Sequence, residues 1–201
     1  SWRIILGPSG ILSTITMNPY TFRTTHSFTE FNVNLDQQIN FSSNPAVDSI
    51  FTRVTGNNNS QILGTLRVDS DADFFLINPN GIFFGAEAEL ELGGAFLATT
   101  ADGIEFGNNF TFSSQAQNTP PVLLTIQPSA LLYSRSNSAP IISQARLRGN
   151  NGEQIRLIGG DVEIANPGGR APLIRAREGL IELGGLLAPG RIGLSADGEL
   201  L

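Results

Sequence analysis

The sequence contains no cysteine, which excludes disulfide bonds, thiolate metal sites and cysteine nucleophiles. In an exported protein this absence would suit a chain that crosses a pore unfolded, because a crosslink would obstruct threading. Lysine is absent too, and all 12 basic residues are arginines. The single histidine excludes a metal site built from several histidines.

Positive charge is scarce: the net charge is −6, and no run of basic residues occurs. This balance argues against binding to nucleic acid or to an anionic membrane surface. No stretch approaches the roughly 20 apolar residues that span a bilayer, so we expect no direct membrane insertion. No signal peptide is recognisable in the opening SWRIILGPSG, and we expect any export signal to have been removed before residue 1.

The residues that are abundant predict an all-β chain. Glycine (22) and asparagine are frequent, phenylalanine (13) is the main aromatic residue, and helical periodicity is hard to find. Instead, short runs rich in Val, Ile, Phe and Thr alternate with Gly, Asn or Asp, which is typical of strands joined by tight corners.

A weak internal repeat favours a solenoid. The segments LELGGAFLA (90–98), RLIGGDVEIA (156–165) and IELGGLLAPG (181–190) each run through a Gly-Gly corner, and the last two pairs lie 25 residues apart. Such a period indicates stacked coils that bury their apolar faces on each other. Strand-type composition favours a parallel β-helix, and a twisted β-sandwich is the alternative.

The middle of the chain breaks this rhythm. The segment NTPPVLLTIQPSALLYSRSNSAP holds four of the eleven prolines, which are confined to edge strands and loops. We therefore predict a single domain in four parts, because an open solenoid end also needs a cap. The parts are an N-terminal cap (1–25), core coils (26–106), an excursion packed against the solenoid (107–151) and further coils (152–201).

Three stretches together resemble a known family. They are HSFTEFNV from His26, SIFTRVTGNNNSQILGTL from Ser49 and DFFLINPNGIFFGAEAELELGGAFLATTAD from Asp73. In this order they resemble the N-terminal secretion domain of the filamentous haemagglutinin family, the exoproteins of bacterial two-partner secretion. The resemblance is close over about residues 26–105, and the tail from about 150 is similar to the repeat body of such exoproteins.

The resemblance implies a fold and a role. Such domains are right-handed parallel β-helices with an N-terminal cap and extra-helical strands. They are recognised in the periplasm by the POTRA domains of a dedicated outer-membrane TpsB transporter, which passes the exoprotein to the cell surface. We therefore expect a monomeric, secreted, non-enzymatic domain without a cofactor. A glycan-binding adhesin module and a polysaccharide-active β-helix enzyme are the alternatives.

The first candidate site is the corner LINPNGIFFG. Pro fixes φ, and Asn and Gly tolerate the left-handed region, so the segment reads as a tight turn between two apolar strands. This corner either serves the architecture alone or is also contacted by the transporter. Its residues are Asn78, Pro79, Asn80, Gly81 and Ile82.

The family has a second Asn-Pro corner upstream, N-P-N-L. The nearest candidate here is Asn44-Pro45, which departs from that pattern at the next two positions, Ala46 and Val47. This departure leaves open the role of the upstream corner at Asn44-Pro45.

Two further groups belong to the family's pattern. His26, Phe28 and Phe31 predict an early strand that either seals the open end of the coil or offers an edge to a POTRA strand. Arg53 is expected to bond carbonyls or a carboxylate at a coil corner. In the neighbouring Ser60-Gln61, the glutamine is a candidate for an inward amide stack.

One acidic run remains. Asp69, Asp71 and Asp73 alternate, and period-2 spacing places them on one side of an extended segment, most simply the solvent side. They lack the spacing of a Ca²⁺ loop, so Ca²⁺ binding and catalysis are the less favoured interpretations.

Overall fold

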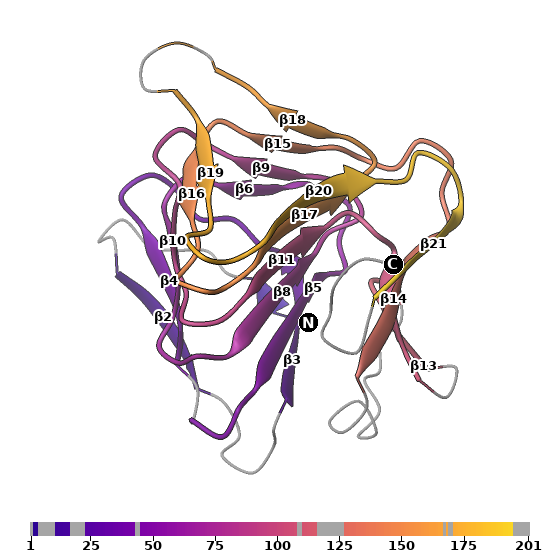
Figure 1. The fold of residues 1–201 in the computed structure, drawn as a ribbon. Helices are drawn as coiled ribbons and strands as arrows, with labels where there is room; N and C mark the ends of the chain where they lie inside the picture. The colour runs from indigo at the N-terminus through magenta and orange to yellow at the C-terminus, as the bar shows by residue number, and fades with distance from the viewer. Residues whose placement is uncertain are drawn as a thin grey trace.

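The computed structural model describes most of the chain, namely residues 2–3, 11–16, 23–42, 45–107, 110–115, 127–166, 168 and 171–194. The described part consists of strands, turns and loops (Figure 1). It contains no apolar helix of membrane-spanning length. The cap predicted for residues 1–25 lies largely outside the described residues, which include only its two short strands and the start of a third.

A seven-stranded parallel sheet, here called the long sheet, forms one wall of the molecule. Arg23 pairs with Ser49, and Ser49 pairs with Asp73, so one turn of the chain takes roughly 25 residues. The strands are, in spatial order, β1 (Trp2–Arg3), β3 (Arg23–Glu30), β5 (Ser49–Val54), β8 (Asp73–Ile77), β11 (Phe96–Thr99), β17 (Ile155–Gly159) and β20 (Ile181–Gly185).

Two further walls complete each turn (Figure 1). The second wall contains β2 (Ile11–Thr16), β4 (Gln38–Ser42), β7 (Thr65–Val68) and β10 (Glu89–Glu91), and beside β10 the pair β16 (Arg146–Arg148) and β19 (Leu173–Arg175). The third wall contains β6 (Ser60–Ile62), β9 (Ile82–Phe84), β15 (Ile141–Ser143) and β18 (Val162–Ile164). All pairings within these walls are parallel.

This arrangement is a parallel β-solenoid of about six turns, which confirms the predicted β-helix. It contradicts the sandwich alternative, because the strands of each wall run in the same direction.

An antiparallel sheet, here called the side sheet, packs beside the long sheet. It consists of β12 (Gly103–Phe106), β13 (Phe110–Ser113), β14 (Pro128–Tyr133) and β21 (Gly190–Gly193). The predicted excursion, residues 107–151, has different limits from the side sheet. β12 leaves the solenoid before residue 107. β15 and β16 lie within the predicted excursion, but they belong to the third and second walls, respectively.

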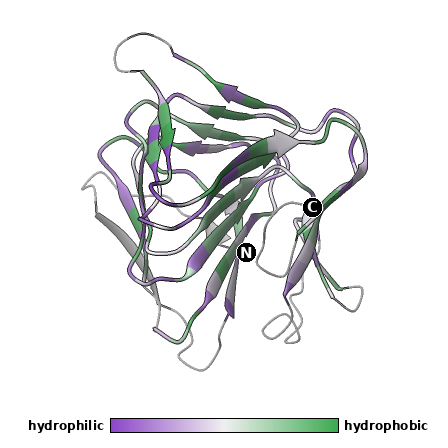
Figure 2. Cartoon of the chain, viewed as in Figure 1, coloured by the Kyte–Doolittle hydropathy of each residue, from purple (hydrophilic) through white to green (hydrophobic). Residues whose placement is uncertain are grey.

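The middle strands of the long sheet, β5, β8, β11 and β17, are buried on both faces, which explains their continuous apolar runs. The inner face of the long sheet joins the solenoid core with residues such as Ile50, Phe74 and Leu76. Its outer face packs Phe51 and Phe75 against side-sheet residues in a second core. Figure 2 shows hydrophobic residues along the long sheet and along β9 and β15. The side sheet therefore acts as a cover for one wall.

The three Gly-Gly corners of the repeat are not equivalent. Gly159 pairs with Gly185, but Gly93 and Gly94 lie at a different corner, between the second wall and the long sheet. What the corners share is close backbone packing. A Cβ at Gly160 would lie 1.9 Å from the Ser138 carbonyl oxygen. At least one glycine of each pair is therefore required by close contact, and not by one common position in the coil.

Candidate functional site

The corner between β8 and β9 is a tight turn. The Gly81 N–H donates to the Asn78 carbonyl oxygen at 3.1 Å, and Pro79 occupies the second position, where its fixed φ is suitable. Gly81 has φ +110°, a backbone conformation that favours glycine. Ile82 starts β9 and is 2% exposed in the solenoid core. The turn thus returns the chain directly into the core.

The Asn78 side chain ties this turn to its neighbours. Its Nδ2 donates to the Asn58 carbonyl oxygen at 3.0 Å and to the Ser60 hydroxyl at 2.9 Å, both in the preceding turn. Its Oδ1 accepts from the Asn80 N–H at 3.0 Å. Its own backbone N–H donates to the Thr99 carbonyl oxygen in the following turn. One fully buried asparagine therefore joins three successive turns of the solenoid.

Asn80 points outward and links the corner to the side sheet. Its Nδ2 donates to the Gly56 carbonyl oxygen at 2.8 Å, and its Oδ1 accepts from Arg135 at 3.4 Å. Arg135 also forms an ion pair with Asp102, Nε to Oδ1 2.8 Å. Asp102 in turn accepts from the N–H and hydroxyl of Ser134, each at 2.7 Å. A polar chain thus runs from the corner to the excursion.

Arg53 lies beneath the side sheet on the outer face of β5, and only 1% of it is exposed. Its Nε donates to the Ser27 hydroxyl at 2.7 Å, and its Nη1 donates to the Ser113 carbonyl oxygen at 2.6 Å. The guanidinium lies 4.4 Å from the centre of the Phe112 ring, a cation–π contact. Burial lowers the pKa of Arg53.

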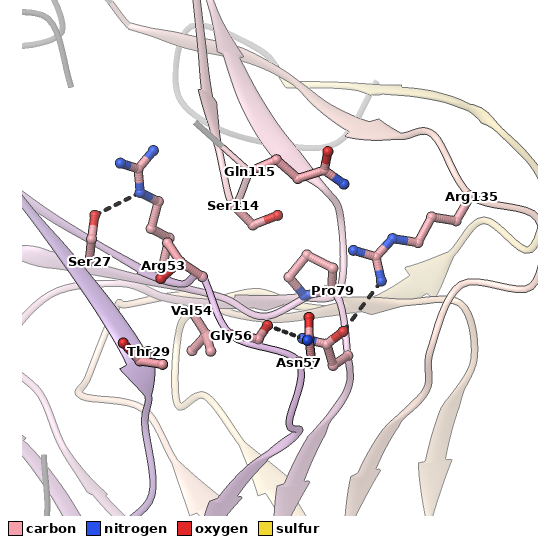
Figure 3. Close-up of a pocket in the computed structure, with 12 residues that line it drawn as sticks. Ser27, Thr29, Arg53, Val54, Gly56, Asn57, Pro79, Ser114, Gln115 and Arg135 are labelled. Atoms are coloured by element: carbon pink, nitrogen blue, oxygen red, sulfur yellow. Dashed lines mark hydrogen bonds between the residues drawn. The ribbon is translucent and has the colours of Figure 1, made fainter. Parts of the chain in front are cut away.

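These groups surround a pocket of about 500 Å³ between the solenoid corner and the side sheet (Figure 3). In Figure 3, Gln115 and Arg135 reach in from the side-sheet part, and Asn57 and Pro79 lie on the solenoid part. The lining residues are Ser27, Thr29, Arg53, Val54, Thr55, Gly56, Asn57, Pro79, Asn80, Ser114, Gln115 and Arg135.

The early strand packs inward. Phe28 and Phe31 are 3% and 1% exposed, and their rings lie 5.5 Å apart in the solenoid core. The His26 ring lies 5.6 Å from that of Phe41 and 6.1 Å from that of Phe28. Burial lowers the pKa of His26 to about 4, so this histidine is neutral near pH 7.

Comparison with known proteins identifies the family. The TPS secretion domain matches residues 14–200, which is nearly the whole chain. The chain belongs to the TPS secretion domain family. This TPS secretion domain is 33% identical over 110 residues to a heme/hemopexin-binding protein of Haemophilus influenzae. The matched segment covers 51% of the chain and 12% of that relative, so the chain spans only a small part of the relative's length.

The upstream corner of this TPS secretion domain is only partly described. Asn44 lies outside the described residues. Pro45 sits in an exposed turn between β4 and β5, and Val47 after it is buried in the solenoid core. The described part of this corner is therefore an exposed turn at Pro45 that is held to the solenoid core by the buried side chain of Val47.

The acidic run does not form one site. Residues 69–71 bend between β7 and β8, so the expected extended segment is wrong. Hydrogen bonding and ion pairing with Arg67 lower the pKa of Asp69, whereas burial raises the pKa of Asp73, which accepts from the Ala95 N–H at 2.9 Å. Asp71 is exposed. Among the described residues, no three acidic or histidine side chains gather as metal ligands.

Sequence reasoning missed two parts of the site. It assigned the inward position to Gln61, but Ser60 is the buried residue and Gln61 is exposed, because β6 alternates in the opposite phase. It also missed Arg135 and Asp102. No local pattern marks them, since Arg135 and Asn80 lie 55 residues apart.

Proposed function

We propose that this TPS secretion domain is the recognition module of a larger TpsA-type exoprotein, bound in the periplasm by the POTRA domains of its TpsB transporter. The family itself supports a secretion-signal role and a transporter partner. Recognition by POTRA domains, a monomeric state and delivery to the surface of a Gram-negative bacterium are parts of the proposal.

One observation carries the proposal: the family match extends over residues 14–200 and therefore includes solenoid, corner and side sheet together. If the transporter recognises a folded surface at this pocket, the signal needs the solenoid, the corner and the side sheet together, because the pocket exists only where these three parts meet. We assign the transporter contact to the outer face of this corner, from Asn57 to Asn80 and across to Arg135.

The domain also offers a template for folding at the cell surface. Several large apolar residues of the last turn are exposed, among them Ile164 (41%), Ile181 (40%) and Leu183 (48%). Coils of a solenoid bury such faces by stacking on their neighbours. We propose that the following coils of the exoprotein stack here, which would make this domain the nucleus of the longer β-helix.

We propose no enzymatic activity for the domain. The enzyme alternative depends on a convergent acidic cluster, and Asp69 and Asp73 form separate contacts instead. The Haemophilus influenzae relative is named for binding heme and hemopexin. If the parent exoprotein binds a ligand of its own, as an adhesin or toxin would, we place that activity outside these 201 residues.

The test is binding of the purified domain to the periplasmic part of its cognate transporter, measured by pull-down and calorimetry. We expect the unchanged domain to bind and Asn80→Ala to bind more weakly, because it loses contacts to Gly56 and Arg135. Asn166→Ala is the matched control: this exposed asparagine lies in the loop after β18 and should leave binding unchanged.

Export provides the second arm of the test. Deleting the domain should abolish appearance of the parent exoprotein outside the cell. The proposal fails if the unchanged domain does not bind the transporter and export continues without the domain. Phe31→Ala is unsuitable as a binding variant, since Phe31 is 1% exposed and its loss would disturb the core.

A further inference from the structure

The pocket at the corner is basic, although the protein is acidic overall. Arg53 and Arg135 line it, and none of the lining residues that the structure describes is an Asp or Glu. A second hollow, of about 400 Å³, lies at the opposite end of the long-sheet strands and mixes both signs, with Asp48, Asp73 and Arg156 among its lining residues. The absence of carboxylates is therefore a property of the corner pocket in particular.

The two arginines contribute differently. Arg53 is buried, and it is desolvated, so a negative group nearby would interact with it more strongly than in water. The Arg135 side chain is 40% exposed and reaches into the pocket from the side-sheet part. Its Nε faces Asp102, which leaves the fork of the guanidinium directed toward Asn80 and the pocket. An arginine fork binds a carboxylate with two parallel hydrogen bonds.

Neutral polar groups complete the lining. Asn57 and Gln115 are exposed and lie on opposite sides of the pocket (Figure 3). Amides and hydroxyls of this kind fix the orientation of a polar ligand, while the charge comes from the arginines. This composition suits one carboxylate on a peptide better than a multiply charged phosphate, for which a denser cluster of cations is usual.

We infer that the corner pocket receives an Asp or Glu side chain of the transporter's periplasmic part, and that Arg135 is the residue that selects it. This inference rests on the proposed function and names the chemistry of the partner at the same site. Recognition then depends on charge as well as on shape, because a neutral or basic side chain would not complement the positive lining of the pocket.

The sharpest test places a negative charge in the pocket. Gln115→Glu changes an exposed residue without removing any contact of Arg53 or Arg135. Gln38→Glu adds the same charge on β4, in the second wall, and is the matched control. We expect Gln115→Glu to bind the periplasmic part about 10-fold more weakly at low salt, with a smaller difference at high salt, and Gln38→Glu to bind as the unchanged domain does.

Arg135→Gln gives the complementary measurement. It should also weaken binding by about 10-fold and reduce the dependence of affinity on salt. Replacing the transporter's periplasmic Asp and Glu residues singly by Asn and Gln should reveal one position that has no additional effect in the Arg135→Gln background. Such a pair locates the carboxylate that occupies the pocket.

Two results would overturn the inference. If the unchanged domain binds and Gln115→Glu binds equally well at both salt concentrations, the pocket does not read charge, although the proposed function stands. If Gln115→Glu lowers the melting temperature of the isolated domain without changing affinity, the positive lining of the pocket serves the stability of the fold and not recognition. Absence of binding by the unchanged domain would instead refute the proposed function.

Discussion

At the scale of single residues, the structure of the corner depends on a few buried polar groups whose hydrogen bonds are satisfied. Asn78 has no exposed surface, and its amide bonds Asn58, Ser60 and Asn80. A buried polar side chain of this kind is specified by its partners, since each of them would be costly to leave unpaired.

Asn78→Ala should therefore destabilise the domain by about 2–4 kcal/mol, because it leaves several buried groups without a partner. Asn59→Ala, at an exposed asparagine in the neighbouring loop between β5 and β6, should change the free energy of unfolding by less than about 0.5 kcal/mol. Urea denaturation of both variants measures the difference. Equal stabilities would show that the amide network contributes little.

His26 makes stability depend on pH. Its pKa is lowered to about 4 in the folded domain, whereas the unfolded chain titrates near 6.5. The unfolded state therefore binds the proton first as the pH falls, so the stabilising effect is complete above about pH 6.5 and is lost between pH 6.5 and 4. The loss amounts to about 3 kcal/mol.

The measurement is the free energy of unfolding against pH for the unchanged domain and for His26→Phe, whose ring suits the site beside Phe28 and Phe41. The difference between the two proteins should change over this range, because all other titrations are shared. Parallel curves would contradict the assignment to His26.

At the scale of strands and corners, the coil is set by how closely backbones approach. Gly160 follows β17 and faces the backbone of Ser138, which leaves no room for a side chain. Gly184, in β20, has no atom of another described residue, its two chain neighbours aside, within 4 Å of the position that a Cβ would take. Two glycines of the same repeat thus differ in what they do.

Gly160→Ala should destabilise the domain by about 2 kcal/mol or more, since the corner must move to accept a methyl group. Gly184→Ala should be neutral or slightly stabilising, because alanine reduces the freedom of the unfolded chain. Thermal unfolding of the two variants checks the pair. A similar loss at both positions would mean that strand flexibility, and not contact, selects these glycines.

The elements also show what the sequence allowed us to predict. The parallel β-helix and the turn at Asn78–Gly81 follow from the repeat and from local turn chemistry. The limits of the side sheet did not follow: Gly103–Phe106 has the composition of another coil strand but belongs to the side sheet, and Ile141–Ser143 lies in a stretch rich in Pro and Ser but belongs to the third wall. Both are decided by partners distant in the sequence, such as Leu131 opposite Ile104.

At the scale of the whole molecule, stability should vary along the solenoid. Each turn contacts its neighbours, so a strand in the middle is held on both sides and a terminal strand on one. β8 pairs with β5 and β11, and the side sheet covers Phe75 on its outer face. β20 pairs with β17 alone among the described strands, and its Ile181 and Leu183 are exposed.

Amide hydrogen exchange should therefore be slower in β8 than in β20, with rates that differ by about 100-fold or more. Mass spectrometry of peptides covering the two strands measures this gradient, and β11 should resemble β8. A longer chain that includes the next coils of the exoprotein should show slower exchange in β20 specifically, because a new strand would then protect its outer edge. Identical protection in β8 and β20 would show that the domain unfolds as one unit. It would also contradict the proposal that the last turn is the nucleus on which further coils stack.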